Sequence, residues 1–448
     1  MVNSFGTDGV RGVANVELTP EVAVGLGRAA VAVVGGRRWL VGADTRASGP
    51  MLVAALAAGL AAAGADVTDL GVVPTPTVAF HAQMAGAPAA VVSASHNPYG
   101  DNGIKLLAAG GRKLSDEVEA RISATLARNV TAPPSGSPGV GGIDRHHDPL
   151  PPYVEHVRRS LEGRRLDGLR VVLDCANGAA SGVAPGVLAG LGAAVSVLSA
   201  QPDGTNINAG CGSTHPDVLQ RAVVAARADA GLAFDGDADR VLAVDHTGAL
   251  VDGDQIIAVC ATDRHRRGRL AGDAVVVTVM SNLGLRLALS ADGIRVVETR
   301  VGDRYVLEAL DAEGLSLGGE QSGHVVFRDL ATTGDGLLTG LQLLDVVART
   351  GRPLAEVAGA AMTRLPQVLR SVGVADRDAL PGAAAVWDEV AAARAELGRR
   401  GRVVLRPSGT EPVVRVMVEA PSHAQATAVA ARIAGVVHAA LGGGPPAG

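Results

Sequence analysis

Apolar and polar positions follow one another along the chain in an order that recurs three times. Leu40 to Asp44 is an apolar run typical of a short buried strand; a Thr/Ser/Gly loop, an Ala-rich helix from about Met51 and a second strand from Asp66 come after it. The same order of strand, loop, helix and strand begins again at Arg170–Asp174 and at Ala274–Val279. Such units favour a mostly parallel sheet with helices on its faces. Three copies predict three related α/β domains.

Each copy is followed by a further strand that runs into a polar loop. The three apolar runs are Ala89–Val92, Ala230–Phe234 and Leu315–Gly318, and the loops after them hold residues 93–98, 235–240 and 319–324. Ligands of open α/β sheets bind at the ends of the strands. We therefore expect these three loops to converge on one central cleft.

The remaining segments complete a four-domain organisation. Residues 131–149 are rich in Pro and Gly and predict an interdomain linker. Residues 402–405 and 413–419 are predicted strands around a polar loop, and the helix after them has Ser422 as its N-cap with Gln425 three residues on. We predict an α/β protein with three similar α/β domains of mixed, mostly parallel sheets (1–150, 151–254 and 255–366) and a smaller C-terminal α+β domain (367–448).

Composition and charge exclude several classes of function. The chain has 448 residues, of which 47% are apolar, so a large core is available. Only 2% are aromatic, which argues against stacking on nucleic-acid bases as a main activity. The net charge is −5 and no long basic run occurs, which argues against a nucleic-acid or anionic membrane surface. We expect no nucleic-acid partner and no membrane partner.

Cysteine usage and the N-terminal residues predict a cytoplasmic protein. Cys175, Cys211 and Cys260 are far apart and odd in number, which is typical of a reducing compartment without disulfides. Residues Met1–Phe5 lack the basic region and apolar region of a signal peptide. The longest uncharged apolar stretch, Met51–Ala65, falls short of the about 20 residues that span a membrane.

The loop Ser93-Ala94-Ser95-His96-Asn97-Pro98 offers a candidate nucleophile. Small residues beside a strand end leave room for a ligand, and Ser95 can carry or accept a phosphoryl group. His96 adjoins Ser95 but need not point at it, so we infer no Ser-His dyad. Taken alone, the residues also fit an ordinary turn with Ser95 as a cap. The polar loops elsewhere in the chain favour the phosphoryl hypothesis.

The second loop places Asp235, Asp237 and Asp239 within five residues and predicts a metal site. A straight strand would spread the outer pair by roughly 13 Å, whereas a tight loop around Gly236 can aim all three carboxylates at one point. Unpaired carboxylates repel one another, and hard oxygen ligands suit Mg²⁺. A calcium EF-hand would need Gly and Glu where the chain has Arg240 and His246. The alternative is an acidic solvated turn.

The loop Arg406-Pro407-Ser408-Gly409-Thr410 has the composition of a phosphate cradle. It combines a guanidinium, hydroxyls and a flexible Gly amide within one turn. Arg415 lies one strand later and can join it. A plain hairpin loop is the alternative interpretation.

Three weaker candidates remain. Glu320, Ser322 and His324 alternate, so in an extended segment they face one side, where they suit sugar hydroxyls. Residues 6–12, with Thr7, Asp8 and Arg11, form a Gly-rich turn without the spacing of a P-loop. Lys105 lies ten residues past Ser95 and can neutralise a phosphate or act as a base. A solvated loop, a plain turn and a solvated lysine are the respective alternatives.

Together these motifs resemble the α-D-phosphohexomutase superfamily nearly end to end and in the same order. The superfamily motifs are Ser-His-Asn-Pro at 95–98, Asp-Gly-Asp-Ala-Asp-Arg at 235–240, Gly-Glu-x-Ser-Gly-His at 319–324 and Arg-Pro-Ser-Gly-Thr-Glu-Pro at 406–412. Motifs typical of the branch that acts on glucosamine phosphates lie at 5–12, 101–105, 206–208, 211–213 and 301–306, with Gln321 in the third loop. One departure is Leu106-Leu107, where the branch commonly has two phenylalanines.

The resemblance implies roles for individual residues. Ser95 is expected to be a phosphoserine, and one Mg²⁺ per site to be held by a phosphoserine oxygen with Asp235, Asp237 and Asp239. Arg11 and Lys105 would flank the reacting phosphoryl group, with Lys105 as general base. Expected substrate-binding residues are Glu320, Ser322, His324, Arg240 and Gly302, and expected ligands of the phosphate not being transferred are Arg406, Ser408, Gly409, Thr410 and Arg415. The four domains would thus bind phosphoserine, metal, sugar and phosphate in turn.

The implied activity is that of an isomerase. It would interconvert glucosamine 6-phosphate and glucosamine 1-phosphate through glucosamine 1,6-bisphosphate, and so supply UDP-N-acetylglucosamine for the cell wall. The small-molecule partner is a phosphosugar, and we expect a homodimer if the chain self-associates. Alternatives are a phosphomannomutase/phosphoglucomutase, a metal-dependent phosphohydrolase and a catalytically silent phosphosugar-binding protein.

Overall fold

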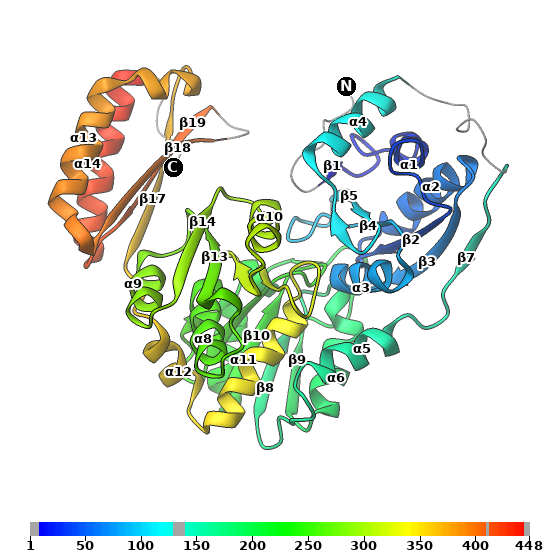
Figure 1. Cartoon of the computed structure of the whole chain (residues 1–448), viewed down its shortest axis with the longest axis horizontal. Helices are drawn as coiled ribbons and strands as arrows, with labels where there is room; N and C mark the ends of the chain where they lie inside the picture. Colours follow the sequence, from blue (N-terminus) through cyan, green and yellow to red (C-terminus); the bar gives the residue numbers. More distant parts are fainter. Residues whose placement is uncertain (1–8, 129–138, 409–411, 443–448) are drawn as a thin grey trace.

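The computed structural model describes residues 9–128, 139–408 and 412–442, which form four consecutive sheets (Figure 1). The first sheet has the strand order β1-β5-β4-β2-β3-β7, with β6 paired to β5. Its strands are β1 (Val10–Val13), β2 (Arg38–Ala43), β3 (Asp66–Val72), β4 (Ala89–Val92), β5 (Asp101–Ala108), β6 (Arg112–Lys113) and β7 (Ile143–Arg145). The helices of this segment are α1 (Pro20–Val34), α2 (Gly49–Ala62), α3 (Thr75–Ala85) and α4 (Asp116–Ala127).

The second and third sheets have the orders β12-β11-β10-β8-β9 and β14-β13-β15-β16. The second segment contains α5 (Leu150–Arg159), β8 (Arg170–Asp174), α6 (Ala184–Gly190), β9 (Ala194–Leu198), α7 (Asp217–Ala226), β10 (Ala230–Phe234), β11 (Val241–Asp245) and β12 (Leu250–Val251). The third contains α8 (Gly253–Arg266), β13 (Ala274–Thr278), α9 (Leu283–Ala291), β14 (Arg295–Thr299), α10 (Asp303–Glu313), β15 (Leu317–Gly319), β16 (Val325–Phe327), α11 (Gly336–Thr350) and α12 (Leu354–Ala361).

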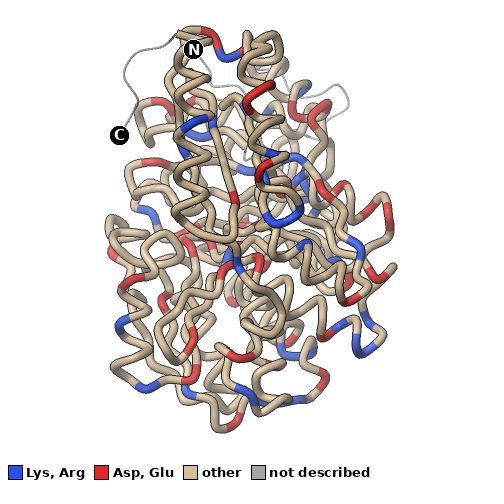
Figure 2. The backbone as a smooth tube through the Cα atoms, turned by 90° about the vertical axis from the view of Figure 1, so that its left-hand side faces the viewer, with Lys and Arg blue, Asp and Glu red and all other residues tan. Residues whose placement is uncertain are grey.

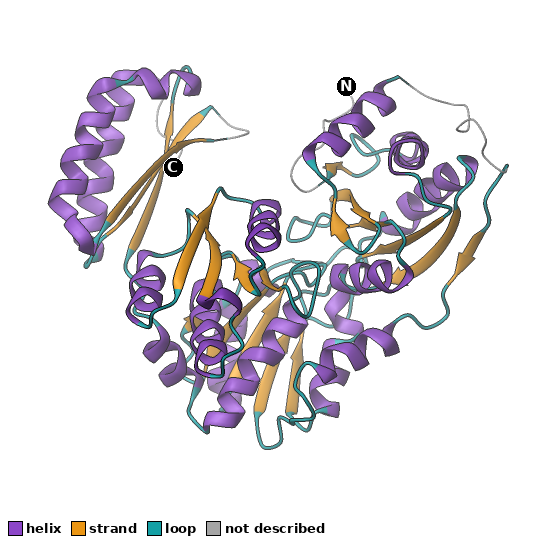
Figure 3. Ribbon diagram, viewed as in Figure 1, coloured by secondary structure: helices purple, strands orange, loops and turns teal. Residues whose placement is uncertain are grey.

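These three sheets share one four-strand order, which confirms the predicted relation between the α/β units. The common cores are β3-β2-β4-β5, β9-β8-β10-β11 and β14-β13-β15-β16. In each core the first three strands are parallel and the fourth is antiparallel. The loop between the third and fourth strands therefore starts at the same place in every unit. Loops from the three units meet near the middle of the molecule in Figure 3.

The fourth sheet is a separate antiparallel layer. It has the order β17-β19-β18 and consists of β17 (Gln367–Gly373), β18 (Arg402–Pro407) and β19 (Val413–Glu419), with α13 (Ala384–Leu397) and α14 (His423–Leu441) packed on it. Ser422 caps α14, since its Oγ accepts from the Gln425 N–H at 3.3 Å. Among the described helices, α14 is long and apolar enough to cross a membrane, but its inner face lies in the core of this sheet. The predicted α+β fold of this segment is confirmed.

Strands that are buried on both faces begin and end close to the predicted residues. The predicted bounds of β4, β8 and β10 are confirmed, and every residue of β4 and β10 is buried. Strands of parallel sheets covered on both faces are near-continuous apolar runs, so the pattern marks them directly.

Acidic and basic residues alternate along the backbone tube in the view of Figure 2, so neither positive nor negative residues dominate that side of the molecule.

The predicted linker and the predicted N-terminal turn each contain a short strand. In the expected linker, β7 pairs in parallel with β3 through Val67 and Ile143. In the Gly-rich segment at the N-terminus, β1 pairs antiparallel with β5, which places Arg11 opposite Gly103; Thr7 and Asp8 lie outside the described residues. Both strands are short edge strands with polar residues, so they lack the apolar run that signals a buried strand.

The second and third α/β units are joined by one continuous hydrophobic core, which extends from Tyr153 to Met362. Tyr153 on α5 is fully buried and donates its hydroxyl to the carboxylate of Asp335 at 2.9 Å. Asp335 is the N-cap of α11 and also accepts from the Leu338 N–H at 2.9 Å. This hydrogen-bonded pair therefore fastens the two units together.

Replacing Tyr153 by phenylalanine should lower the free energy of unfolding by about 1–3 kcal/mol, because a buried carboxylate loses its donor. Burial raises the pKa of Asp335 to about 6, above that of the unfolded chain. The ionised form therefore weakens the fold as the pH rises through about 6, and the substitution should matter more at pH 8 than at pH 4. Thermal unfolding at both pH values measures this. Tyr99→Phe, at an exposed tyrosine, is the matched control; an equal effect of both substitutions would contradict the account.

Candidate active site

Ser95 lies in the loop between β4 and β5 with a left-handed backbone, φ 53°. Its N–H donates to Ser93 Oγ at 2.9 Å, and its own Oγ donates to Asp235 Oδ2 at 2.6 Å. Left-handed φ values are uncommon for residues other than glycine and are typical of sites where a side chain must be aimed. The hydroxyl of the first unit is thus directed at a carboxylate of the second.

The loop after β10 gathers the three aspartates. One oxygen from each of Asp235, Asp237 and Asp239 lies within 4.8 Å of the others, and all three residues are buried. Ala238 reverses the chain with φ 57°. A Cβ on Gly236 would lie 2.6 Å from the carbonyl oxygen of Ser95, so only glycine lets the two loops approach this closely. The tight loop predicted for these residues is present.

The three aspartates raise one another's proton affinity and leave buried oxygens without hydrogen bonds. Burial raises the pKa of Asp235 well above its usual range, and the charges of Asp239 and Asp237 raise it further. Asp237 Oδ1 and Asp239 Oδ1 are buried without a hydrogen-bond partner among the described residues. Hard, closely spaced carboxylate oxygens with unused lone pairs are the donor set of a divalent cation. The residues present therefore fit a metal ion.

Lys105 is the cation that contacts this cluster from the first unit. It lies on β5 opposite Val91 of β4, and its Nζ donates to Asp237 Oδ2 at 2.9 Å and to Asp239 Oδ2 at 3.4 Å. Burial alone would raise the pKa of Asp239, but Lys105 and His324 hold it well below its usual range. The ammonium and the carboxylates of this site therefore belong to different units of the fold.

Arg11 and Arg240 lie close enough to His96, the residue after the nucleophile, for their charges to act on its imidazole. Burial lowers the pKa of His96 to about 4, and the charges of Arg240 and Arg11 lower it further. The His96 Nδ1 lies 3.3 Å from Ser95 Oγ, while that hydroxyl donates to Asp235. Arg240 Nε is 3.7 Å from Asp239 Oδ1. The loop of Ser95 is therefore neighboured by two guanidinium groups and a neutral imidazole.

The loop between β15 and β16 is a tight turn, so Glu320, Ser322 and His324 do not follow one another along an extended segment. Glu320 N–H donates to the carbonyl of His324 at 3.0 Å, and Gly323 has φ 91°. The side chain of His324 is 3% exposed and lies between Asp239 and Asp303, at 3.7 and 3.6 Å. In this structure His324 faces the aspartate cluster, with its ring enclosed by protein.

Glu320, Gly302 and Ser322 are nevertheless brought together at this turn. Glu320 Oε1 accepts from the Gly302 N–H at 3.0 Å. Ser322 Oγ is buried and has no hydrogen-bond partner among the described residues. A carboxylate and an unused hydroxyl at the same turn are groups that can bind hydroxyls of a polar ligand.

Arg406 and Arg415 occupy facing positions on β18 and β19. Burial lowers the pKa of Arg406, and the charge of Arg415 lowers it further. Like charges directly opposite each other destabilise a strand pair, so this end of the hairpin favours an anion. Ser408 is buried at its tip, and its carbonyl accepts from Arg377 Nη1 at 2.6 Å. Gly409 and Thr410 lie outside the described residues, and the sheet stands apart from the aspartate loop in Figure 1.

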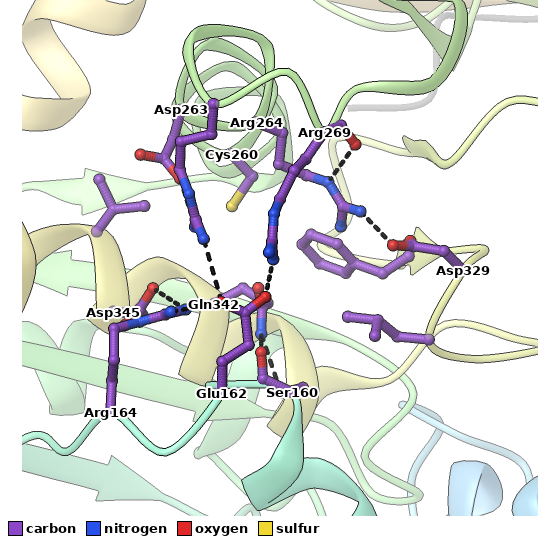
Figure 4. A pocket seen from close by; sticks show the side chains of 14 residues that line it. Ser160, Glu162, Arg164, Cys260, Asp263, Arg264, Arg269, Asp329, Gln342 and Asp345 are labelled. Atoms are coloured by element: carbon purple, nitrogen blue, oxygen red, sulfur yellow. Dashed lines mark hydrogen bonds and ion pairs between the residues drawn. The ribbon is translucent and has the colours of Figure 1, made fainter.

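A cavity of about 290 Å³ lies elsewhere, at the junction of α5, α8 and α11 (Figure 4). Its arginines are paired with acids: Arg264 with Asp329, and Arg164 with Asp345 at 2.7 Å. Figure 4 shows each of these pairs as neighbouring side chains joined by a dashed line. Paired charges of this kind stabilise the junction, and we assign no catalytic role to it.

Comparison with known proteins places the whole chain in one family. Four profiles described as phosphoglucomutase/phosphomannomutase match it in order: alpha/beta/alpha domain I at residues 2–132, domain II at 151–248, domain III at 252–365 and the C-terminal domain at 369–436. The chain belongs to the phosphoglucomutase/phosphomannomutase family.

Several relatives within this family cover nearly the full length. Phosphoglucosamine mutase of Frankia casuarinae is 56% identical over 463 residues, with 100% of each chain covered. Phosphoglucosamine mutase of Desulforudis audaxviator is 53% identical over 443 residues, with 97% of each chain covered. The sequence resemblance to the α-D-phosphohexomutases is thereby confirmed.

Solved structures show the same fold. A phosphoglucomutase/phosphomannomutase family protein of Burkholderia thailandensis has a TM-score of 0.83 and 28% identity, with 100% of both chains covered. N-acetylphosphoglucosamine mutase of Aspergillus fumigatus, in complex with GlcNAc-6P and magnesium, has a TM-score of 0.71 and 20% identity, with 98% of this chain and 96% of that chain covered. At 20% identity, the second structure shows only that the fold is shared.

The sequence reasoning missed several residues of this family member's site. Thr75 Oγ1 donates to Asp237 Oδ2 at 2.6 Å. Arg46 donates to carbonyls of the Ser95 loop, and so does Asn208 of the second unit, which lies in the 206–208 motif but was given no role there. A signal existed for Arg46, since Asp44-Thr45-Arg46 follows β2 as Ser95 follows β4, at the ends of parallel strands.

Proposed function

We propose that this protein is a phosphoglucosamine mutase that interconverts glucosamine 6-phosphate and glucosamine 1-phosphate. Its relatives at 53–56% identity bear that name over nearly the full length. The observation that carries the proposal is the hydrogen bond from Ser95 Oγ to Asp235, which joins a nucleophile on one unit to a carboxylate cluster on the next. The product would feed the synthesis of UDP-N-acetylglucosamine.

The proposed mechanism uses Ser95 as a phosphoryl carrier. Phosphoserine 95 donates its phosphoryl group to O1 of glucosamine 6-phosphate: the bond from phosphorus to Oγ breaks, a bond to O1 forms, and the O1 proton passes through a base to Ser95 Oγ. The 1,6-bisphosphate then reorients in the site. Its 6-phosphoryl group moves to Ser95 Oγ as the bond from phosphorus to O6 breaks, and the Oγ proton passes through the base to O6. Such transfer depends on alignment and charge neutralisation. The loops of Ser95, Asp235 and Glu320 supply the alignment.

The cation we propose is Mg²⁺, held by Asp235, Asp237, Asp239 and a phosphoserine oxygen. Bound there, it would neutralise charge on the phosphoryl group. Lys105 Nζ pairs with Asp237 and Asp239. It is placed to neutralise phosphoryl charge or, as general base, to take the proton of the attacking hydroxyl. Arg11 is assigned to the same reacting phosphoryl group.

The sugar and its second phosphate are assigned to the other two loops. Glu320 and Ser322 would bind sugar hydroxyls, with Gly302, Arg240 and His324 around them. The hairpin of β18 and β19 would bind the phosphate that is not transferred, through the residues predicted there: Arg406, Ser408, Gly409, Thr410 and Arg415. The homodimer and the cytoplasmic location remain predictions from the sequence.

Replacing Arg406 by methionine should raise the KM for glucosamine 6-phosphate by about 10- to 100-fold, because a charge-assisted contact to phosphate contributes a few kcal/mol. Steady-state kinetics would measure this. Arg400→Met, at an exposed residue just before the opposite end of β18, is the matched control and should leave KM unchanged. Equal KM values for wild type and Arg406→Met would show that Arg406 does not bind the phosphate of the substrate.

Initial rates on glucosamine 6-phosphate, glucose 6-phosphate and mannose 6-phosphate would test the proposed activity. We expect the highest kcat/KM on the glucosamine compound, with no net release of free phosphate. A preference for mannose or glucose phosphate would instead assign a phosphomannomutase/phosphoglucomutase. Steady release of phosphate would assign a phosphohydrolase.

A further inference from the structure

Arg46 is a fully buried arginine whose every N–H is used beside the nucleophile. Its Nε donates to Asp44 Oδ2 at 2.9 Å. Its Nη2 donates to the carbonyls of Ser95 at 3.0 Å and Asn97 at 2.8 Å, and its Nη1 donates to those of Pro98 and, at 3.0 Å, Asp101. A guanidinium has five N–H donors in a fixed plane. Here all five are satisfied, four of them by the loop that carries Ser95.

Two further contacts hold the same loop. Asn208, in the second unit, donates from Nδ2 to the carbonyls of Ser95 at 2.9 Å and Asn97 at 3.0 Å. Asp44, which orients Arg46, also accepts from Ser93 Oγ at 2.6 Å, and that oxygen accepts the Ser95 N–H. The backbone on both sides of Ser95 is thus fixed by buried polar groups, while its Oγ alone reaches the aspartate cluster.

We propose that Arg46 is a positioning residue for phosphoryl transfer, which holds Ser95 in the left-handed conformation that directs Oγ at Asp235. This inference rests on the proposed function, since it assigns the purpose of a loop that would carry phosphoserine. The donors of the Arg46 side chain are used by Asp44 and by backbone carbonyls, and none of them goes to the described carboxylates of Asp235, Asp237 and Asp239. Its influence on the reaction therefore passes through the Ser95 backbone.

A lysine cannot replace this arginine, although it keeps the charge. An ammonium has three donors and no planar fork, so it cannot serve Asp44 and four carbonyls together. The loop would lose some of the hydrogen bonds that fix its backbone, and Ser95 Oγ would no longer be aligned with Asp235. A displacement of about 1 Å at a reacting group can cost on the order of 100-fold in rate. Because Arg46 is buried and all its donors are used within the protein, binding of the phosphosugar should change little.

The test compares Arg46→Lys with the wild type in kinetics and in hydrogen exchange. We expect kcat to fall by about 100-fold with KM within about threefold, and peptides covering residues 95–101 to exchange faster than in the wild type. Arg264→Lys is the matched control: this buried arginine pairs with Asp329 in the cavity of Figure 4. It should lower Tm and leave kcat unchanged.

A folded Arg46→Lys variant with kcat within threefold of the wild type and unchanged exchange of residues 95–101 would overturn the inference. If that variant does not fold, Ser93→Ala and Asn208→Ala decide: each should lower kcat by about tenfold, and wild-type kcat in both would overturn it. A wild-type protein without mutase activity would instead contradict the proposed function. Hydrogen exchange of residues 95–101 in Arg46→Lys would then still test whether Arg46 holds the Ser95 loop.

Discussion

Replacing Ser95 by alanine should abolish conversion of glucosamine 6-phosphate to glucosamine 1-phosphate, with a loss of kcat on the order of 10⁴-fold or more. The substitution removes the only oxygen that can lend a phosphoryl group from this position. It also removes the hydrogen bond to Asp235, but the hydrogen bonds from Arg46 and Asn208 to the backbone carbonyl of residue 95 remain. We therefore expect a folded protein with a Tm close to that of the wild type. Coupled assay of glucosamine 1-phosphate measures the loss.

The matched control for this experiment is Ser371→Ala. Ser371 is an exposed residue on β17, in the last sheet. It should have the activity of the wild type. Activity of Ser95→Ala within tenfold of the wild type would show that Ser95 does not carry the phosphoryl group. The carboxylate cluster would then have no phosphoryl carrier beside it.

Magnesium should stabilise the wild type and fail to stabilise Asp235→Asn. At a magnesium concentration 100 times its Kd, the free energy of unfolding should rise by about 2.7 kcal/mol. The variant removes one of three carboxylates from the buried cluster, so most of this increase should be lost, and kcat should fall by about 100-fold or more. Thermal unfolding with and without magnesium, after treatment with a chelator, measures the first effect.

Asp329→Asn is the control for the magnesium experiment. Asp329 is an acid of the cavity in Figure 4, where it pairs with Arg264. It should keep the full magnesium-dependent shift in Tm. A shift of equal size in Asp235→Asn would show that the ion binds elsewhere, and the assignment of the cluster as the metal site would be wrong.

Much of the scaffold can be predicted from the sequence because its central strands are buried on both faces. Apolar runs mark β4, β8 and β10, and the polar loops after β4 and β10 hold Ser95 and the aspartates. Among the strands that were not predicted, β1, β5 and β7 contain polar residues and pair at or near the sheet edge. Their hydrogen bonds, and not their side-chain pattern, place them in the sheet. Arg11 and Lys105 reach the site only because β1 and β5 are strands.

Other parts of the site depend on contacts that no sequence pattern contains. Arg46 binds backbone carbonyls, which every residue has, so nothing in the sequence identifies its acceptors. The alternation of Glu320, Ser322 and His324 would place them on one side only in an extended segment, whereas Gly323 at φ 91° reverses the chain there. His324 consequently faces Asp239. A pattern of residue types therefore located the loops but not the directions of their side chains.

Transfer of an isotopic label from the enzyme to the sugar would test the central claim most directly. The protein would be prepared with labelled phosphate on Ser95, its position verified by peptide mapping, and mixed with unlabelled glucosamine 6-phosphate. The account predicts that the label leaves Ser95 and appears in the sugar phosphates, while Ser95 remains phosphorylated by unlabelled phosphate. Label that stays on the protein during turnover, or that leaves as free phosphate, would contradict it.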